Sequence, residues 1–323
     1  MKSLFTFFIL LTATIAFAQK QVTTFYKNYG RQVSLRDSAD YMRTISAPDS
    51  GSKLYNVNDY YMSGQSKLSG KSRSPEYAYF EGECQEFYIT GKRKTVSMYK
   101  TNALVGQQQL FYNNGIVAET RLYGDTVIRD PYALPERQYL IIALNDSTGT
   151  ALITNGNGHY KKQTSATDKL IEEGDVKAGL REGLWKGRDD GAKITFQEYY
   201  SGGKLIKGTS VTSGADSVQY SGYRYRLPQF KGGIKNFYQF LARSVRYPQR
   251  AVQKSIQGRV DVGFVVEKDG SLVDIASSSK VDEELVAEAI RVMKKSPAWE
   301  PGIRFGRPVR VFFTSPIIFT LGR

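Results

Sequence analysis

Residues 259–278 have the pattern of two strands joined by a tight turn, and this hairpin constrains the fold more than any other feature of the chain. Apolar residues occupy every second position after Arg259, so one face of the first strand carries Val260, Val262, Phe264 and Val266. Asp269-Gly270 follows, and an Asp-Gly pair between two such runs is typical of a hairpin turn. Residues 272–278 are predicted to return as the second strand, so we expect an antiparallel sheet.

An amphipathic helix and a third strand complete this pattern. Residues 282–295 place an apolar stripe on one side of a predicted helix, formed by Leu285, Ala289, Val292 and Met293. In the predicted strand 308–321, alternate residues again form one apolar face, and Pro316 lacks the N–H group that a central strand needs. The third strand is therefore expected at the edge of the sheet, where free backbone groups can pair with another chain.

Short motifs around these elements occur in a fixed order. A helix predicted for 234–245 ends at Tyr247-Pro248, because Pro disfavours helical geometry in the residue before it. It is followed by Gly258-Arg259-Val260, Asp269-Gly270, Trp299-Glu300-Pro301-Gly302 and Gly306-Arg307-Pro308-Val309. This ordered set resembles the C-terminal domain of TonB, the periplasmic protein that engages outer-membrane transporters in Gram-negative bacteria.

The resemblance implies a fold and a partner for residues 228–323. The fold is an α+β domain, a TonB-like three-stranded antiparallel sheet with packed helices. In the family, this sheet captures an N-terminal peptide segment of a TonB-dependent outer-membrane transporter as an added strand, held by backbone hydrogen bonds. The partner-binding residues that carry over are Arg246, Tyr247, Arg310, Val311, Phe312, Phe313 and Thr314.

Three aromatic and aliphatic residues of this region are expected to be structural. The side chains of Val311 and Phe313 lie on the predicted core face, so only their backbones would face a partner. Trp299 is expected to pack beneath the Pro301-Gly302 turn.

Residues 76–210 contain a repeated pattern of glycine and tyrosine. Each unit has two glycines and, eight residues after the second, a tyrosine: Gly82, Gly91 and Tyr99, then Gly106, Gly115 and Tyr123, then Gly183, Gly191 and Tyr199. A strand-like stretch precedes each tyrosine, and such a period indicates stacked supersecondary units. The third unit contains Gly183-Leu184-Trp185 and resembles MORN-type β-hairpin repeats. We predict a β-rich MORN-like region that acts as a scaffold or a second binding surface.

The N-terminus has the pattern of an export signal. An apolar run extends from Leu4 to Ala18 behind Lys2, and Ala16-Phe17-Ala18 fits a signal-peptidase site, so residues 1–18 are predicted to be removed. The run is shorter than the ~20 residues that span a bilayer as a helix, although an uncleaved short anchor stays an alternative. We expect the protein in the periplasm or cell envelope.

Two other stretches are predicted to lack a domain of their own. Residues 19–75 are polar and rich in Ser, Asp and Tyr, which indicates an irregular or lightly structured lead-in, with Thr23–Tyr29 and Tyr41–Ile45 as candidate short strands. Residues 211–227 begin with a segment of Gly and Ser, which indicates a linker.

The chain departs from TonB in the parts that couple that protein to its energy source. TonB carries a His in an uncleaved N-terminal helix and has a Pro-rich spacer. Here the apolar run has no His, and residues 19–227 contain only Pro48, Pro75, Pro131 and Pro135. These absences argue against energy transduction and against inner-membrane motor proteins as partners, but not against the fold. The sequence does not fix the oligomeric state, so a homodimer formed through the last strand stays an alternative.

Composition argues against catalysis and metal binding. The chain has one Cys, Cys84, and one His, His159, which excludes an intramolecular disulfide and a Cys/His metal site of ordinary spacing. It has no Gly-x-Ser-x-Gly motif and no phosphate-binding loop. We predict a binding protein that is not an enzyme and uses no cofactor.

The formal net charge of +14 supports a second hypothesis. A basic exported protein can bind anionic lipid or polysaccharide through its β-repeat surface, as a structural or adaptor protein of the envelope. Nucleic acid is not an expected partner for an exported chain.

Overall fold

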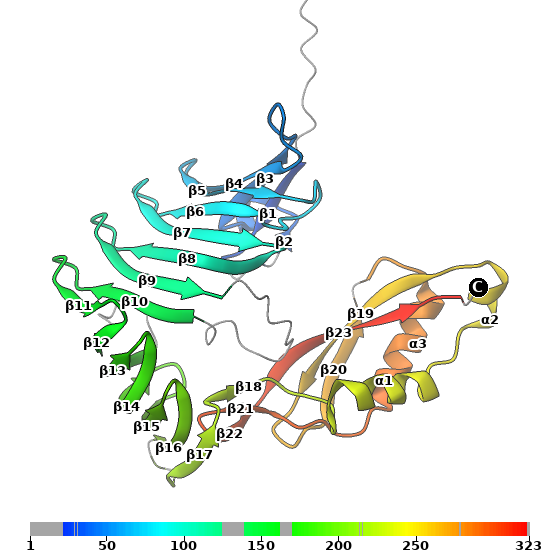
Figure 1. The fold of residues 1–323 in the computed structure, drawn as a ribbon. Helices are drawn as coiled ribbons and strands as arrows, with labels where there is room; N and C mark the ends of the chain where they lie inside the picture. Colours follow the sequence, from blue (N-terminus) through cyan, green and yellow to red (C-terminus); the bar gives the residue numbers. More distant parts are fainter. Residues whose placement is uncertain are drawn as a thin grey trace, which may run out of the picture. The chain divides into compact units, whose positions relative to one another are not determined.

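The computed structural model describes residues 22–321 except Tyr29, Arg31, 125–138, 162–169, Ser213, Ala215 and Ser278. It divides into two compact units, the first ending at Ile116 and the second starting at Val117. Strands dominate both units (Figure 1). Within the described ranges, no helix is both long enough and apolar enough to cross a membrane. The signal peptide expected at residues 1–18 lies outside these ranges.

The first unit is built from short antiparallel strands. β1 (Val22–Tyr26) pairs with β2 (Gln32–Val33) and with β3 (Tyr41–Ser46), and a short 3-10 helix, Arg36–Ser38, lies between β2 and β3. Each later strand pairs with the one before it: β4 (Tyr55–Tyr61), β5 (Ser66–Ser72), β6 (Gly82–Phe87), β7 (Arg93–Lys100) and β8 (Ala103–Phe111). Their inward side chains form a small core of Ile45, Val57, Leu68 and Cys84.

Strands β1 to β5 occupy the stretch that was expected to be an irregular lead-in. That expectation rested on the polar composition of the stretch, although the candidate short strands at Thr23–Tyr29 and Tyr41–Ile45 agree with β1 and β3. In the structure, its polar residues alternate with buried ones such as Val57. Asp59 is itself buried, and Arg43 holds it with two hydrogen bonds of 2.7 and 2.8 Å. Because a paired carboxylate can be buried at tolerable cost, a polar sequence forms a strand here.

The second unit opens with an antiparallel meander. Its strands are β9 (Val117–Tyr123), β10 (Tyr139–Asn145), β11 (Ala151–Thr154), β12 (Asn157–Lys161), β13 (Leu170–Lys177), β14 (Leu180–Asp189), β15 (Ile194–Ser201), β16 (Lys204–Thr212) and β17 (Val218–Gly222). Each pairs with the next in sequence. Trp185 is fully buried at the centre, with the rings of Tyr160 and Tyr200 at 5.3 and 6.3 Å.

Two of the expected repeat units are hairpins. β6 and β7 pair around a turn that contains Gly91, and β14 and β15 pair around a turn that contains Gly191. A β-rich region is therefore present at 76–210, while its membership of the MORN family stays a prediction.

The C-terminal sheet has three antiparallel strands in the order β20–β19–β23. These are β19 (Gly258–Val266), β20 (Leu272–Ser277) and β23 (Val311–Phe319). The helices α1 (Gly233–Ser244), α2 (Gln249–Gln253) and α3 (Glu283–Lys294) accompany this sheet (Figure 1). The apolar face of β19 packs with Leu285, Ala289 and Met293 of α3, as the alternation predicted.

The Asp-Gly turn between β19 and β20 is fixed by its neighbour Trp299. Gly270 has φ +86°, and a Cβ atom there would lie 1.9 Å from the Trp299 carbonyl oxygen. The Trp299 N–H donates to the Gly270 carbonyl at 2.8 Å. Trp299 is buried against Phe230, Phe237 and Phe264, so it has the structural role expected of it.

The predicted linker contains strands, and a second small sheet follows from it. β18 (Tyr225–Arg226) pairs with β21 (Gly302–Arg304), which pairs with β22 (Arg307–Val309). The turn between β21 and β22 presents Phe305, which is fully buried and stacks on Phe196 of β15 at 4.8 Å. Tyr220 and Tyr225 of the segment 211–227 pack edge-on against the same Phe305 ring at 6.4 and 5.3 Å, a long-range contact that the Gly and Ser content of the segment does not reveal.

Candidate partner-binding edge

β23 lies at the edge of the C-terminal sheet. In the described part of the chain it pairs with β19 alone, with Phe264 opposite Phe313 and Asp261 opposite Pro316. An edge position suits Pro316, because Pro has no N–H to give to a second neighbour. The other side of β23 therefore offers backbone groups to an incoming strand.

The side chains of β23 alternate between core and solvent. Ile317 and Phe319 are buried, and Phe313 packs against Phe264 and Trp299, so Phe313 is a core residue as expected. On the opposite face, Phe312 is 67% exposed and Ile318 is 65% exposed. Thr314 and Pro316 are also exposed on that face. The edge thus combines free backbone groups with an outward apolar surface.

Arg310 lies just before β23 and is tied to the same sheet. Its guanidinium donates to Glu267 at 2.6 Å and to Asp274 at 2.8 Å. The hydrogen bond that Arg310 donates to Glu267, followed by the charge of that carboxylate, raises the pKa of Arg310. Because both pairs are exposed to solvent, they orient Arg310 more than they stabilise the fold.

Arg246 and Tyr247 lie at the other end of β23 from Phe312. The Tyr247 hydroxyl donates to the Ile256 carbonyl at 2.6 Å, and its ring packs edge-on against Phe319 at 5.6 Å. The Arg246 N–H donates to Glu288 of α3 at 2.6 Å, while its side chain is exposed. Of the seven residues expected from sequence, the structure gathers 310–314 on one edge and places this pair apart.

Comparison with known proteins identifies the C-terminal segment. Residues 243–321 match the family described as Gram-negative bacterial TonB protein C-terminal. These residues belong to the TonB C-terminal family. The solution structure of the TonB C-terminal domain from Helicobacter pylori is also similar, at 23% sequence identity, over 28% of this chain and 80% of that one, with a TM-score of 0.23. No curated protein matches the chain.

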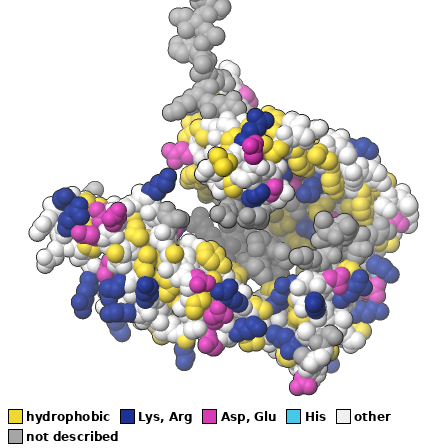
Figure 2. All heavy atoms as spheres, turned by 180° about the vertical axis from the view of Figure 1, so that it is seen from behind, with side chains coloured by type: hydrophobic (Ala, Val, Ile, Leu, Met, Phe, Trp, Pro, Cys, Tyr) yellow, Lys and Arg dark blue, Asp and Glu magenta, His cyan; other side chains and the backbone are white. Residues whose placement is uncertain are grey.

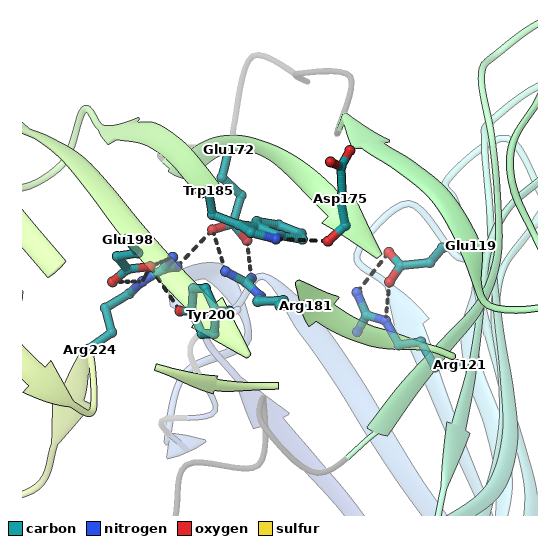
Figure 3. Close-up of polar contacts among 9 residues, drawn as sticks. All are labelled: Glu119, Arg121, Glu172, Asp175, Arg181, Trp185, Glu198, Tyr200 and Arg224. Carbon is teal, nitrogen blue, oxygen red and sulfur yellow. Dashed lines mark hydrogen bonds and ion pairs between the residues drawn. The ribbon is translucent and has the colours of Figure 1, made fainter. Parts of the chain in front are cut away.

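A buried cluster of charges joins the repeat strands to the segment that leads into the TonB-like domain (Figure 3). Arg224 donates to Glu172 of β13 at 2.8 Å and to both carboxylate oxygens of Glu198 of β15, each at 2.9 Å. Arg181 also donates to Glu172, at 3.0 Å. The hydroxyl groups of Tyr200 and Tyr220 donate to Glu198, both at 2.8 Å.

This cluster, which sequence reasoning missed, is electrically balanced. Burial alone would raise the pKa of Glu172, but the charges of Arg181 and Arg224 outweigh burial and lower it to about 2. Burial likewise opposes ionisation of Glu198, while hydrogen bonds from Arg224 and the two tyrosines lower its pKa. Because every charge has an opposite partner, the cluster holds the segment in place and leaves no group poised to react with a substrate.

The Cys and the His have ordinary surroundings. Cys84 is buried in the core of the first unit, where burial raises the pKa of its thiol to about 12, so it is not a reactive thiolate. His159 is exposed, and its Nδ1 lies 2.7 Å from Asp175 on the neighbouring strand. The described residues include no group of three or more His, Cys, Asp or Glu placed to hold a metal ion.

The outward face of the repeat strands carries three cations that are paired with carboxylates. Lys161 and Lys186 flank Glu173 at 3.4 and 3.0 Å, and Arg188 pairs with Asp190 at 3.0 Å. These residues lie along β12 to β14, beside an open groove of about 730 Å³. Because these three cations are neutralised within the sheet, this part of the face is a weaker match for an anionic polymer than the net charge suggested.

Proposed function

We propose that this protein is an envelope binding protein whose TonB-like domain captures an extended segment of an outer-membrane transporter at the edge of β23. The transporter segment pairs with the free side of β23 as an added strand. Backbone hydrogen bonds supply affinity, and the outward side chains select the sequence. By holding a transporter in this way, the protein takes part in energy-dependent transport across the outer membrane.

The one-sided pairing of β23 is the observation that carries this proposal. Its outward face exposes Phe312 and Ile318. These two apolar side chains can contact those side chains of a paired strand that point to the same face. Family membership adds independent support, because the matched residues 243–321 contain all of β23.

The repeat region serves as a scaffold in this proposal. Phe305, between β21 and β22, is buried against Phe196, and the side chain of Ser210 donates to the Phe305 carbonyl at 2.8 Å. Arg304 forms an ion pair with the buried Asp189. These contacts hold the TonB-like domain against β15 and β16. A pulling force applied to β23 is therefore transmitted to the repeat strands.

Proline substitution at adjacent positions of β23 tests the proposal. Successive N–H groups of a strand point to opposite sides, so one of Phe312 and Phe313 directs its N–H outward. We expect one of Phe312→Pro and Phe313→Pro to keep the fold and to lose at least about tenfold in affinity for transporter peptides, since a lost backbone hydrogen bond and a kinked edge act together. The probes are synthetic N-terminal segments of the outer-membrane transporters of the same bacterium, measured by fluorescence anisotropy.

The Phe312→Ala variant is the matched control, because it removes the ring and keeps the N–H. It separates the backbone contribution from the side-chain contribution. If both proline variants stay folded and bind the peptides as tightly as the unchanged protein, strand addition at β23 is ruled out.

A further inference from the structure

The segment between Asp216 and Asp261 contains no acidic residue, and every charged residue in it is Lys or Arg. It includes all of α1 and α2. Figure 2 shows groups of Lys and Arg side chains on the described surface, with fewer Asp and Glu side chains beside them. These Lys and Arg residues differ in whether a carboxylate of the same molecule pairs with them.

Four of these cations have carboxylate partners. Arg224 and Arg226 pair with Glu198 and Glu300, and Arg250 and Arg259 pair with Glu284 and Asp261. Among the described residues, five others form no ion pair: Lys231, Lys235, Arg243, Arg246 and Lys254. All five are exposed.

Several of these cations lie on the side of α1 that faces away from the core. Phe237, Phe240 and Leu241 of α1 pack into the core. At 100° per residue, Lys235, Tyr238 and Ala242 lie on the opposite side of the helix, with Arg243 at its border. Tyr238 is 61% exposed, and Ile234 is 40% exposed at the other border.

The end of α3 adds two more cations to the same helical layer. Arg291 of α3 donates to the Ser244 carbonyl at the end of α1, at 2.8 Å. Trp299 packs against Phe237 in the middle of α1 at 5.4 Å. The intervening Lys294 and Lys295, both exposed, therefore run beside α1 in the antiparallel direction. We call these six cations with Tyr238 the α1 surface: Lys231, Lys235, Arg243, Arg246, Lys294 and Lys295.

We propose that the α1 surface docks on an anionic phospholipid bilayer. Unpaired cations match lipid phosphates, and a tyrosine among them suits the boundary between headgroups and acyl chains. A helical layer is convex, which fits a membrane plane better than a polysaccharide chain that needs a groove. Three outward cations of the repeat strands, Lys161, Lys186 and Arg188, by contrast already have carboxylate partners.

This docking would leave the β23 edge accessible. α1 and α3 pack on the face of the sheet that carries Val260 and Phe264, whereas Phe312 and Ile318 point to the other face. The inference rests on the envelope location in the proposed function, but it concerns a different surface. The protein could therefore hold a transporter segment while lying on the membrane.

Vesicle co-sedimentation of the purified full protein tests this inference. The probes are phosphatidylcholine vesicles with and without phosphatidylglycerol. We expect binding only to the anionic vesicles, falling with added salt as the Debye length shortens. Because each cation near an anionic surface contributes about fivefold in affinity, the triple variant Lys231→Gln, Lys235→Gln, Arg243→Gln should bind roughly 100-fold more weakly.

A triple variant elsewhere provides the matched control. Lys53→Gln, Lys204→Gln and Lys268→Gln remove the same net charge from exposed positions outside the α1 surface. This control should keep vesicle affinity within about fivefold. An equal loss in both triple variants would show that net charge alone drives binding, and would overturn the proposal.

Two further outcomes separate this inference from the proposed function. Binding to purified peptidoglycan, without binding to anionic vesicles, would overturn the bilayer proposal and leave strand addition untouched. The α1 triple variant should keep its affinity for transporter peptides, and the proline variants of β23 should keep their affinity for vesicles. Loss of both activities in either variant would contradict the assignment of two separate surfaces.

Discussion

The ring of Phe312 lies across Gly263 on the neighbouring strand, 2.8 Å from the position that a Cβ atom would take there. Gly263 is opposite Thr314 in the ladder, so Phe312 reaches it diagonally. A glycine in a central strand weakens the sheet, and an aromatic ring laid over it shields the exposed backbone. Phe312 therefore covers the sheet when β23 has no partner and lies at the edge where a partner would pair.

We expect Gly263→Ala to displace the Phe312 ring without unfolding the domain. The new Cβ meets the far end of a side chain that can rotate away, so the free energy of unfolding should change by less than about 1 kcal/mol. Transporter-peptide affinity should change, because the ring moves on the binding edge. Urea denaturation and peptide titration check both parts, and an unchanged affinity would show that Phe312 has no part in recognition.

Gly270→Ala should destabilise the TonB-like domain strongly. A Cβ atom at this positive φ would lie 1.9 Å from the backbone oxygen of Trp299, which cannot rotate away. We expect a loss of about 2–4 kcal/mol in the free energy of unfolding, measured by urea denaturation. Gly233→Ala is the control, since Gly233 has a similar φ of +81° with nothing within 4 Å of its Cβ position, and it should cost only about 1 kcal/mol.

Arg224→Met should cost about 3–5 kcal/mol of stability. It leaves the carboxylates of Glu172 and Glu198 buried without their shared cation. Arg188→Met, which removes an exposed cation paired with Asp190, should change stability by less than about 1 kcal/mol. Equal losses in the two variants would contradict the structural role of the buried cluster.

Stability should fall in acid because of Glu172. Its pKa is about 2 in the folded chain, against an ordinary value of 4.5, so ionised Glu172 stabilises the folded state. This contribution is present above about pH 4.5 and is lost as the pH falls toward 2. Denaturation midpoints measured across this range should decline, and Glu172→Gln should flatten the decline while lowering stability at neutral pH.

The sequence predicted those parts of the C-terminal domain that depend on local spacing. Alternation identified β19 and the core face of β23, and the lack of an N–H at Pro316 placed β23 at the edge. The Asp-Gly pair located the β19–β20 turn. These predictions were accessible because strand period and turn chemistry act over a few neighbouring residues.

Tertiary contacts between distant residues decided the rest. The stretch 19–75 forms strands because ion pairs such as Arg43–Asp59 allow polar residues into a sheet. The expected linker is ordered because Arg224 reaches Glu172 and Tyr225 packs against Phe305. Tyr247 supports the core because folding brings it to Phe319. The sequence by itself determined which residues could form strands, helices and turns, whereas only the folded chain decided which charges are paired and which stay free to bind.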